Sequence, residues 1–99
     1  MAQVAYVARA RAALERLLTF LEQADPVHAS EVLAGIAEAV ELLERHPLMG
    51  RPAAQDYREL VISRGKTGYV ALYRYDHERE AVVILALRPQ REAGFVETE

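Results

Sequence analysis

Hydrophobic residues recur with two different periods along this chain of 99 residues. From about Arg9 to Arg45 they return every three or four positions, the period of a helix with one buried face. Before and after this region apolar and polar residues alternate with period two, which indicates strands. The pattern therefore predicts one strand, then two helices, then three more strands.

The helical region is divided at Asp25-Pro26. Pro26 has no N–H, which costs nothing at the first position of a helix, and Asp25 can accept hydrogen bonds from the free amides there. A tight break between two helices predicts an antiparallel helical hairpin. The apolar stripe of the first helix is Ala10, Leu14, Leu17, Leu18, Leu21 and Ala24; that of the second is Val32, Ile36, Val40 and Leu43, flanked by Leu33 and Ala37.

The predicted strands are residues 3–7, 57–63, 69–75 and 81–87. Residues 64–68 and 76–80 are predicted turns, and residues 46–56 an irregular loop because they contain Gly50 and two prolines. Residues 81–87 are nearly all apolar, which predicts a central strand covered on both faces. Simple alternation places Val83, Leu85 and Leu87 on one face of it and Val82, Ile84 and Ala86 on the other.

The helices are segregated from most of the strands, which predicts an α+β fold with the helical hairpin packed on one face of a mostly antiparallel sheet. The length fits a single domain, which we expect to span residues 1–96, with residues 97–99 as a frayed C-terminal tail.

The composition narrows the classes of function. The net charge is −3, whereas proteins that grip a phosphate backbone usually have a basic excess, so we expect no direct contact with nucleic acid. There is no cysteine, and the three histidines lack the spacing of metal ligands, so we expect no cofactor and no metal. The longest apolar run, residues 81–87, is far too short to span a bilayer. We therefore expect a cytoplasmic protein with no membrane partner.

Three segments together resemble a known family. They are HPLMGRP (46–52) leading into YRELVIS (57–63), GYVALYRYD (68–76), and VVILALRPQREAGF (82–95). In this order they resemble the ParE/RelE superfamily, the small toxins of bacterial type II toxin–antitoxin modules, also called plasmid stabilisation proteins. The resemblance implies a β-α-α-β-β-β fold and a cognate antitoxin whose flexible segment wraps around the toxin. It implies assembly as a homodimer or as a toxin–antitoxin hetero-oligomer.

The superfamily contains two mechanisms: RelE-like members cleave mRNA on the ribosome, and ParE-like members inhibit DNA gyrase. RelE-like toxins use cationic residues and a C-terminal tyrosine for catalysis. The matching positions here hold Val70, Pro89 and Phe95, which neither carry charge nor transfer a proton. A shift of one residue would place Arg88 or Gln90 at the second position.

The resemblance is therefore closer to the ParE branch, and we expect an interaction protein that inhibits gyrase rather than an enzyme. A ribosome-dependent mRNA endonuclease is the alternative, with Arg74, Arg88 and Arg91 as its catalytic residues. Glu59, Arg64 and Lys66 are the other charged groups that could gather around a substrate.

The polar stretch RPQREAGF (88–95) follows the most apolar strand, and we interpret it as a contact surface. Planar arginine donors grip carboxylates well, and antitoxins of this kind are acidic and fold on binding. The predicted contacts with the antitoxin or the target are Arg51, Arg74, Arg88, Gln90, Arg91 and Phe95. For Arg51 an ion pair with Glu59 is the alternative. Tyr69, Tyr73 and Tyr75 share one strand face, either for packing or, less often in such ladders, for docking.

Overall fold

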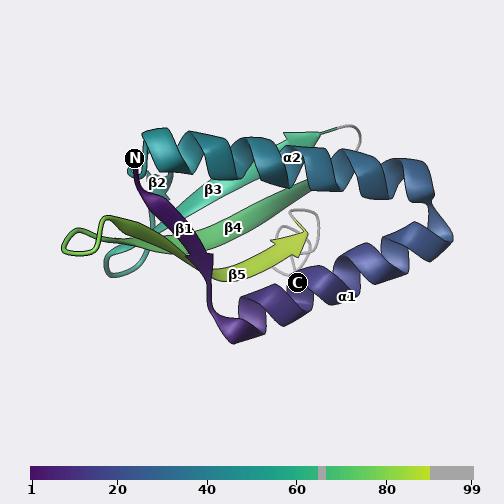
Figure 1. The fold of residues 1–99 in the computed structure, drawn as a ribbon, viewed down its shortest axis with the longest axis horizontal. Helices are drawn as coiled ribbons and strands as arrows, with labels where there is room; N and C mark the ends of the chain where they lie inside the picture. Colours follow the sequence, from purple (N-terminus) through teal and green to yellow (C-terminus); the bar gives the residue numbers. More distant parts are fainter. Residues whose placement is uncertain (65–66, 90–99) are drawn as a thin grey trace.

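Two helices cover one face of a five-stranded sheet (Figure 1). The computed structural model describes residues 1–64 and 67–89. The elements are β1 (Gln3–Tyr6), α1 (Ala8–Ala24), α2 (Pro26–Arg45), β2 (Arg51–Pro52), β3 (Tyr57–Arg64), β4 (Thr67–Asp76) and β5 (Ala81–Pro89). The predicted α+β fold is confirmed, and most element boundaries differ from the predicted ones by one or two residues. The predicted tail, residues 97–99, lies outside the described residues.

The strand order in the sheet is β1-β5-β4-β3-β2. β1 pairs with β5 in parallel, and the other three pairs are antiparallel, so the sheet is mostly antiparallel as predicted. Hydrogen bonds from Gln3 N to Glu80 O (3.0 Å) and from Val7 N to Ile84 O (3.0 Å) join the first strand to the last hairpin. β5 is therefore an interior strand.

The helical hairpin turns at Asp25, as predicted. The Asp25 backbone N–H donates to Leu21 O at the end of α1, and its side chain accepts from His28 N (3.2 Å) at the start of α2. Pro26 occupies the first turn of α2. Ala24, predicted to belong to the apolar stripe, is exposed, because the last turn of α1 has already left the sheet surface.

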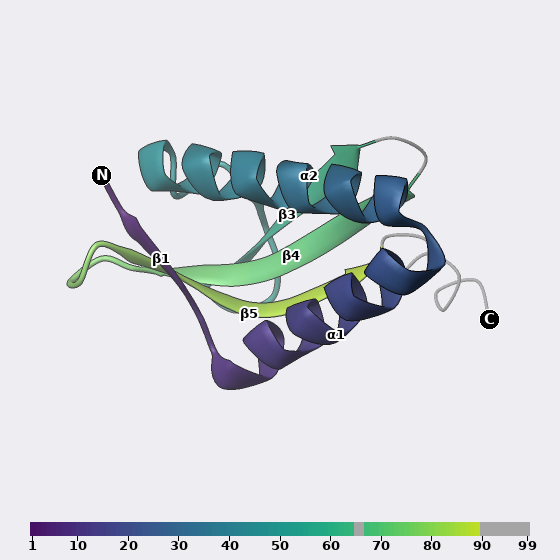
Figure 2. The ribbon, with the colours of Figure 1, turned by 45° about the vertical axis from the view of Figure 1, so that its right-hand side comes forward.

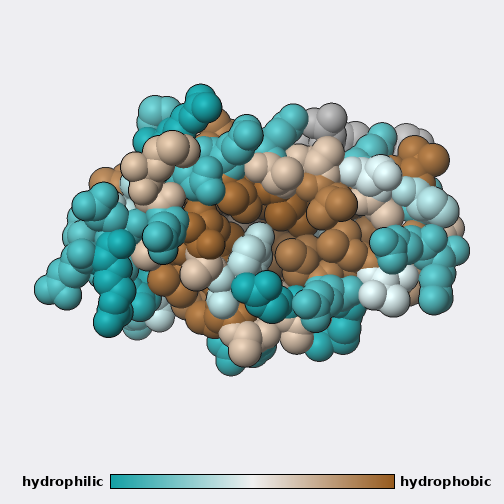
Figure 3. Space-filling view, in the orientation of Figure 1, coloured by the Kyte–Doolittle hydropathy of each residue, from teal (hydrophilic) through white to brown (hydrophobic). Residues whose placement is uncertain are grey.

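The helices diverge from this turn, so they form a wedge above the sheet (Figures 1 and 2). Apolar surface fills the wedge in Figure 3. Two groups of buried residues make the core: Leu21, Ala29, Val32, Ile36 and Tyr69 near the turn, and Ala2, Ala10, Leu43, Tyr73, Val82 and Ile84 toward the open end. Tyr69 and Tyr73 are thus packing residues, and the docking interpretation is wrong for these two.

A β-bulge interrupts the pairing of β4 with β5. Tyr73 is paired with Ile84 but Leu72 with Ala86, so Leu85 is an extra residue without a partner. The alternation of sides changes there, and Leu87 packs in the core under the helices. The prediction that Leu87 shares a face with Val83 and Leu85 is therefore wrong, because simple alternation does not hold across the extra residue.

The segment 46–56 contains a strand that was not predicted. Arg51 pairs with Glu59 and Pro52 with Arg58, which makes β2 a two-residue edge strand. Proline is tolerated at an edge because its missing N–H would point away from the sheet. The predicted irregular loop is thus wrong at these two positions. Within the described ranges, neither helix is long and apolar enough to cross a membrane.

Candidate functional site: the sheet face opposite the helices

The sheet face that points away from the helices carries charged groups around an apolar floor. Leu60 and Ile62 pack toward the helices, so the alternating residues Glu59 and Val61 point the other way. Across the sheet, Glu59 is in register with Leu72 and Ala86, and Val61 with Val70 and Arg88. We call this surface the open face.

Glu59 lies between two arginines on the open face. Its Oε1 accepts from Arg51 Nε at 3.2 Å and is also 3.2 Å from Arg51 Nη2, while its Oε2 is 4.0 Å from Arg88 Nη2. The arginine side chains are 71% and 53% exposed, and that of Glu59 only 22%. Exposed ion pairs contribute about 0–1 kcal/mol, so both guanidinium groups remain able to bind another carboxylate.

The bulge at Leu85 is the reason that Arg88 belongs to this group. With strict alternation Arg88 would share the side of Val82 and Ile84, which is the core under the helices. The extra residue shifts Ala86 and Arg88 to the side of Leu72 and Val70 instead. Bulges often re-aim a side chain in this way beside functional sites.

Arg74 lies on the same face, in register with Tyr57 and Val83. It is two residues along β4 from Leu72, which is the position opposite Glu59. Its charge acts on the carboxyl of Asp76. The pKa of the Asp76 carboxyl is lowered mainly by the hydrogen bond from Arg79 N, with the charges of Arg79 and Arg74 as lesser causes. Arg74 thus extends the positive charge of the open face toward the β4–β5 turn.

The structure places three of the six predicted contact residues, and it brings Arg51 and Arg88 together around Glu59. Arg74 is on the same face but apart from that group. The remaining three, Gln90, Arg91 and Phe95, lie outside the described residues, as does Lys66. The side chain of Arg64 is likewise not described.

The floor of the open face is apolar. Val61 is 40% exposed, Leu72, Val83 and Leu85 are half-buried, and Val70 is buried. Val70 is paired with Arg88 on one side and Val61 on the other. The floor residues that the structure describes therefore provide apolar contact, and their side chains cannot donate a proton.

A hollow beside the connection between α2 and β2 was not predicted. The hollow has a volume of about 210 Å³ and is lined by Leu48, Pro52, Gln55, Asp56, Tyr57, Arg58, Tyr75 and His77. The rings of Tyr75 and His77 pack edge to face with centroids 4.6 Å apart. The alternation of Tyr73 and Tyr75 signalled a packing strand, but nothing local indicates that Tyr75 borders a hollow. Among the residues that the structure describes, no three His, Cys, Asp or Glu are grouped as metal ligands would be.

The fold is a small two-layer one, with arginines gathered around Glu59 on the sheet face opposite the helices. Residues 4–94 match the family described as the ParE toxin of the type II toxin–antitoxin system parDE. The match covers nearly the whole chain, so the protein belongs to this family and is a toxin of the type II class.

Two curated toxins are similar to this chain in sequence. The chain is 38% identical over 80 residues to "Toxin RelE3" of Caulobacter vibrioides, covering 81% of this chain and 85% of the relative. It is 29% identical over 89 residues to "Putative toxin Y4kP" of Sinorhizobium fredii, covering 89% and 91%.

Two solved structures share the fold of this chain. The chromosomal ParDE system from P. aeruginosa superimposes with a TM-score of 0.67 at 22% identity, covering 90% of this chain and 96% of that one, and shows the shared fold. The toxin–antitoxin complex RelBE2 from Mycobacterium tuberculosis superimposes with a TM-score of 0.61 at 28% identity, covering 90% and 91%.

Proposed function

We propose that this toxin acts by binding and inhibiting DNA gyrase, and that a cognate antitoxin neutralises it by covering the open face. The observation that carries the proposal is the arrangement of Arg51, Glu59 and Arg88 around an apolar floor. Such a surface binds a protein chain well, because arginines supply directed contacts and the floor supplies apolar area. Since gyrase acts on the chromosome, the proposal places the protein in the cytoplasm.

The antitoxin contact follows from charge. Arg51, Arg74 and Arg88 share one face, and the one carboxylate between them is already divided between two guanidinium groups. An acidic segment that folds on binding fits this surface. The similar solved structures are a ParDE system and a RelBE2 toxin–antitoxin complex, which supports an antitoxin partner here. The predicted contacts Gln90, Arg91 and Phe95 belong to the same proposal.

Metal-free RNA cleavage requires a base for the 2′-hydroxyl, a cation for the phosphorane charge and an acid for the leaving oxygen. Val70 and Pro89 stand where the resemblance expects cationic groups, and Val70 is buried. These residues support an interaction protein over an enzyme, and we propose no cofactor and no direct nucleic-acid partner.

A ribosome-dependent mRNA endonuclease is the second candidate. It is favoured by the relative named "Toxin RelE3", at 38% identity, and by the Glu59 carboxylate 4.0 Å from the Arg88 guanidinium. In this case Glu59 would serve as the base and Arg88 would stabilise the developing charge, with Arg74 and Arg91 binding the RNA backbone.

Two assays run side by side test the proposal: gyrase supercoiling of relaxed plasmid and cleavage of mRNA on programmed ribosomes. We expect inhibited supercoiling with intact mRNA. Cleaved mRNA with unaffected gyrase, and loss of that cleavage in Glu59→Gln and Arg88→Ala, would replace the proposal by the nuclease. Light scattering of the toxin alone and with its antitoxin distinguishes a homodimer from a hetero-oligomer.

A further inference from the structure

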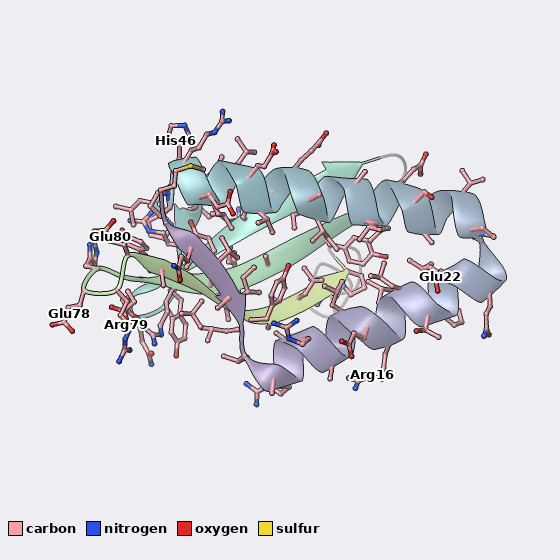
Figure 4. The ribbon with its side chains drawn as sticks, viewed as in Figure 1. Arg16, Glu22, His46, Glu78, Arg79 and Glu80 are labelled. Carbon is pink, nitrogen blue, oxygen red and sulfur yellow. The ribbon has the colours of Figure 1, made fainter. Side chains whose placement is uncertain are left out.

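Two large apolar side chains stand exposed in the short connection between α2 and β2. Leu48 is 47% exposed and Met49 is 44% exposed. The connection starts at His46, at the end of α2 that is remote from the Asp25 turn (Figure 4). Single exposed apolar residues are common on protein surfaces, but these two are adjacent on one loop.

The loop is fastened to the sheet at Leu48 and Gly50, and a local hydrogen bond holds Met49 to the end of α2. Gly50 N donates to the hydroxyl of Tyr73 at 2.9 Å, and Arg58 Nη1 donates to Leu48 O at 3.1 Å and to Gly50 O at 2.8 Å. Met49 N donates to His46 O at 3.1 Å. Because Tyr73 is fully buried and is the cross-strand partner of Arg58, these anchors belong to the sheet itself.

Gly50 makes this close attachment possible. A Cβ at this position would lie 2.6 Å from the Tyr73 hydroxyl and 2.8 Å from Glu59 O. The loop backbone therefore presents Leu48 and Met49 in one arrangement, and the backbone entropy that binding would otherwise cost is already lost in the free protein. Methionine is enriched in protein interfaces, and a few anchor residues carry most of their binding energy.

Three arginines lie around the loop. Arg45 precedes it, Arg51 follows it and is paired with Glu59, and Arg58 binds its carbonyls. Leu48 also forms part of the wall of the 210 Å³ hollow, so a convex and a concave element lie side by side. Asp56 is the one carboxylate that lines this hollow. The surface thus matches a partner with an apolar pocket and acidic groups at its rim.

We propose that Leu48 and Met49 form a knob that inserts into a preformed, acid-rimmed apolar pocket on the protein that this toxin inhibits. A rigid knob needs a pocket that exists before binding, which a folded target has and an antitoxin segment that folds on binding does not. The inference rests on the proposed function in that the target is a protein. In this inference the target binds the knob and the antitoxin binds the open face.

The test is the double variant Leu48→Ser/Met49→Ser. Its matched control is Val27→Ser/Leu33→Ser, which removes two apolar side chains that are 72% and 54% exposed on α2. Both pairs are at the surface, and thermal unfolding checks that the fold is kept. We expect the concentration of the double variant that gives half-inhibition of gyrase supercoiling to be at least tenfold higher than that of the wild type, and the control to match the wild type.

The charge reversal Arg45→Glu tests the acidic rim of the pocket without altering the loop. We expect this variant to inhibit gyrase more weakly than the wild type.

Co-purification with the cognate antitoxin tests whether the antitoxin and the target bind different surfaces. We expect the double variant to co-purify with it as the wild type does. The inference is overturned if the double variant inhibits supercoiling as strongly as the wild type. It is also overturned if the double variant no longer co-purifies with the antitoxin but still inhibits gyrase.

Growth arrest on induction separates this inference from the gyrase proposal. Wild-type toxin could arrest growth without inhibiting gyrase. If that arrest is lost in the double variant and kept in the control variant, the knob is supported and gyrase is excluded as its target. An arrest that persists in the double variant overturns the knob.

Discussion

Glu59 and Arg88 lie on β3 and β5, and their side chains approach to 4.0 Å across the intervening strand β4. They meet because Leu85 is an extra residue in β5, which turns Arg88 away from the core and onto the open face. A single unpaired residue in one strand thus determines the charge of the surface that we assign to the antitoxin.

Arg88→Ala should weaken binding of the acidic antitoxin about 10- to 100-fold, because hydrogen bonds to charged groups contribute about 1.5–3 kcal/mol. Titration calorimetry with the antitoxin measures this. The matched control is Arg79→Ala, which removes an 82% exposed arginine at the β4–β5 turn (Figure 4). Equal affinities for the two variants would place the antitoxin elsewhere.

Glu59→Gln should strengthen antitoxin binding a few-fold at low salt. The substitution removes the carboxylate that competes for Arg51 and Arg88, and screening should reduce the gain as salt is added. Stability should change by less than about 1 kcal/mol, since both ion pairs are exposed. The measurement is the association rate at several ionic strengths, with Glu80→Gln as the control. Weaker binding by the variant would mean that Glu59 instead orients the two arginines.

Gly50→Ala should lower the free energy of unfolding by about 1–3 kcal/mol, the range for overpacking. The added methyl group would meet the Tyr73 hydroxyl at 2.6 Å and the Glu59 carbonyl at 2.8 Å, and a backbone oxygen cannot move aside cheaply. Urea denaturation followed by circular dichroism gives the value. An unchanged midpoint would show that the loop is loosely attached, and would weaken the case for a rigid knob.

Tyr73→Phe should also destabilise the protein by about 1–3 kcal/mol, because the buried Gly50 N–H loses its acceptor. Tyr75→Phe is the control: the Tyr75 ring packs on His77, and its hydroxyl makes no hydrogen bond to the residues that the structure describes. Urea midpoints of the two variants should differ clearly, and similar values would contradict the role of the Tyr73 hydroxyl as an anchor.

Asp76→Asn should reveal a pH-dependent contribution from the β4–β5 turn. The Asp76 carboxylate accepts from Glu78 N, Arg79 N and Arg79 Nη1, and its pKa in the folded state lies below the ordinary 3.8. Its stabilising contribution is therefore present above about pH 4 and is lost as the pH falls through the lowered pKa. We expect wild type to melt higher than the variant at pH 7 and the difference to shrink as the pH is lowered below about 4. A difference that does not depend on pH would contradict a role for the charge.

Features that depend on neighbouring residues could be predicted from the sequence, and those that depend on distant ones could not. The break at Asp25-Pro26 needs only one capping side chain and one missing N–H, and it was predicted correctly. The strand β2 depends on Glu59 and Arg58, six or more residues later, and it was missed.

The same distinction applies to the site. Arg88 could be chosen because planar arginine donors after an apolar strand suit a contact surface, and the ion pair of Arg51 with Glu59 was one of the two interpretations of Arg51. The approach of Arg88 to Glu59 follows from the bulge, which is a property of how β4 and β5 pair. The Tyr73 anchor of Gly50 spans 23 residues, so the glycine alone indicated a turn but not the core group that holds it.

The parallel pairing of β1 with β5 has a consequence for synthesis on the ribosome. The first strand to leave the exit tunnel finds its partner only in the last strand of the sheet. Until residues 81–89 have emerged, β1 has no neighbouring strand and the core residues Val82 and Ile84 are absent from beneath the helices. The nascent chain therefore cannot complete this sheet before residues 81–89 have left the ribosome.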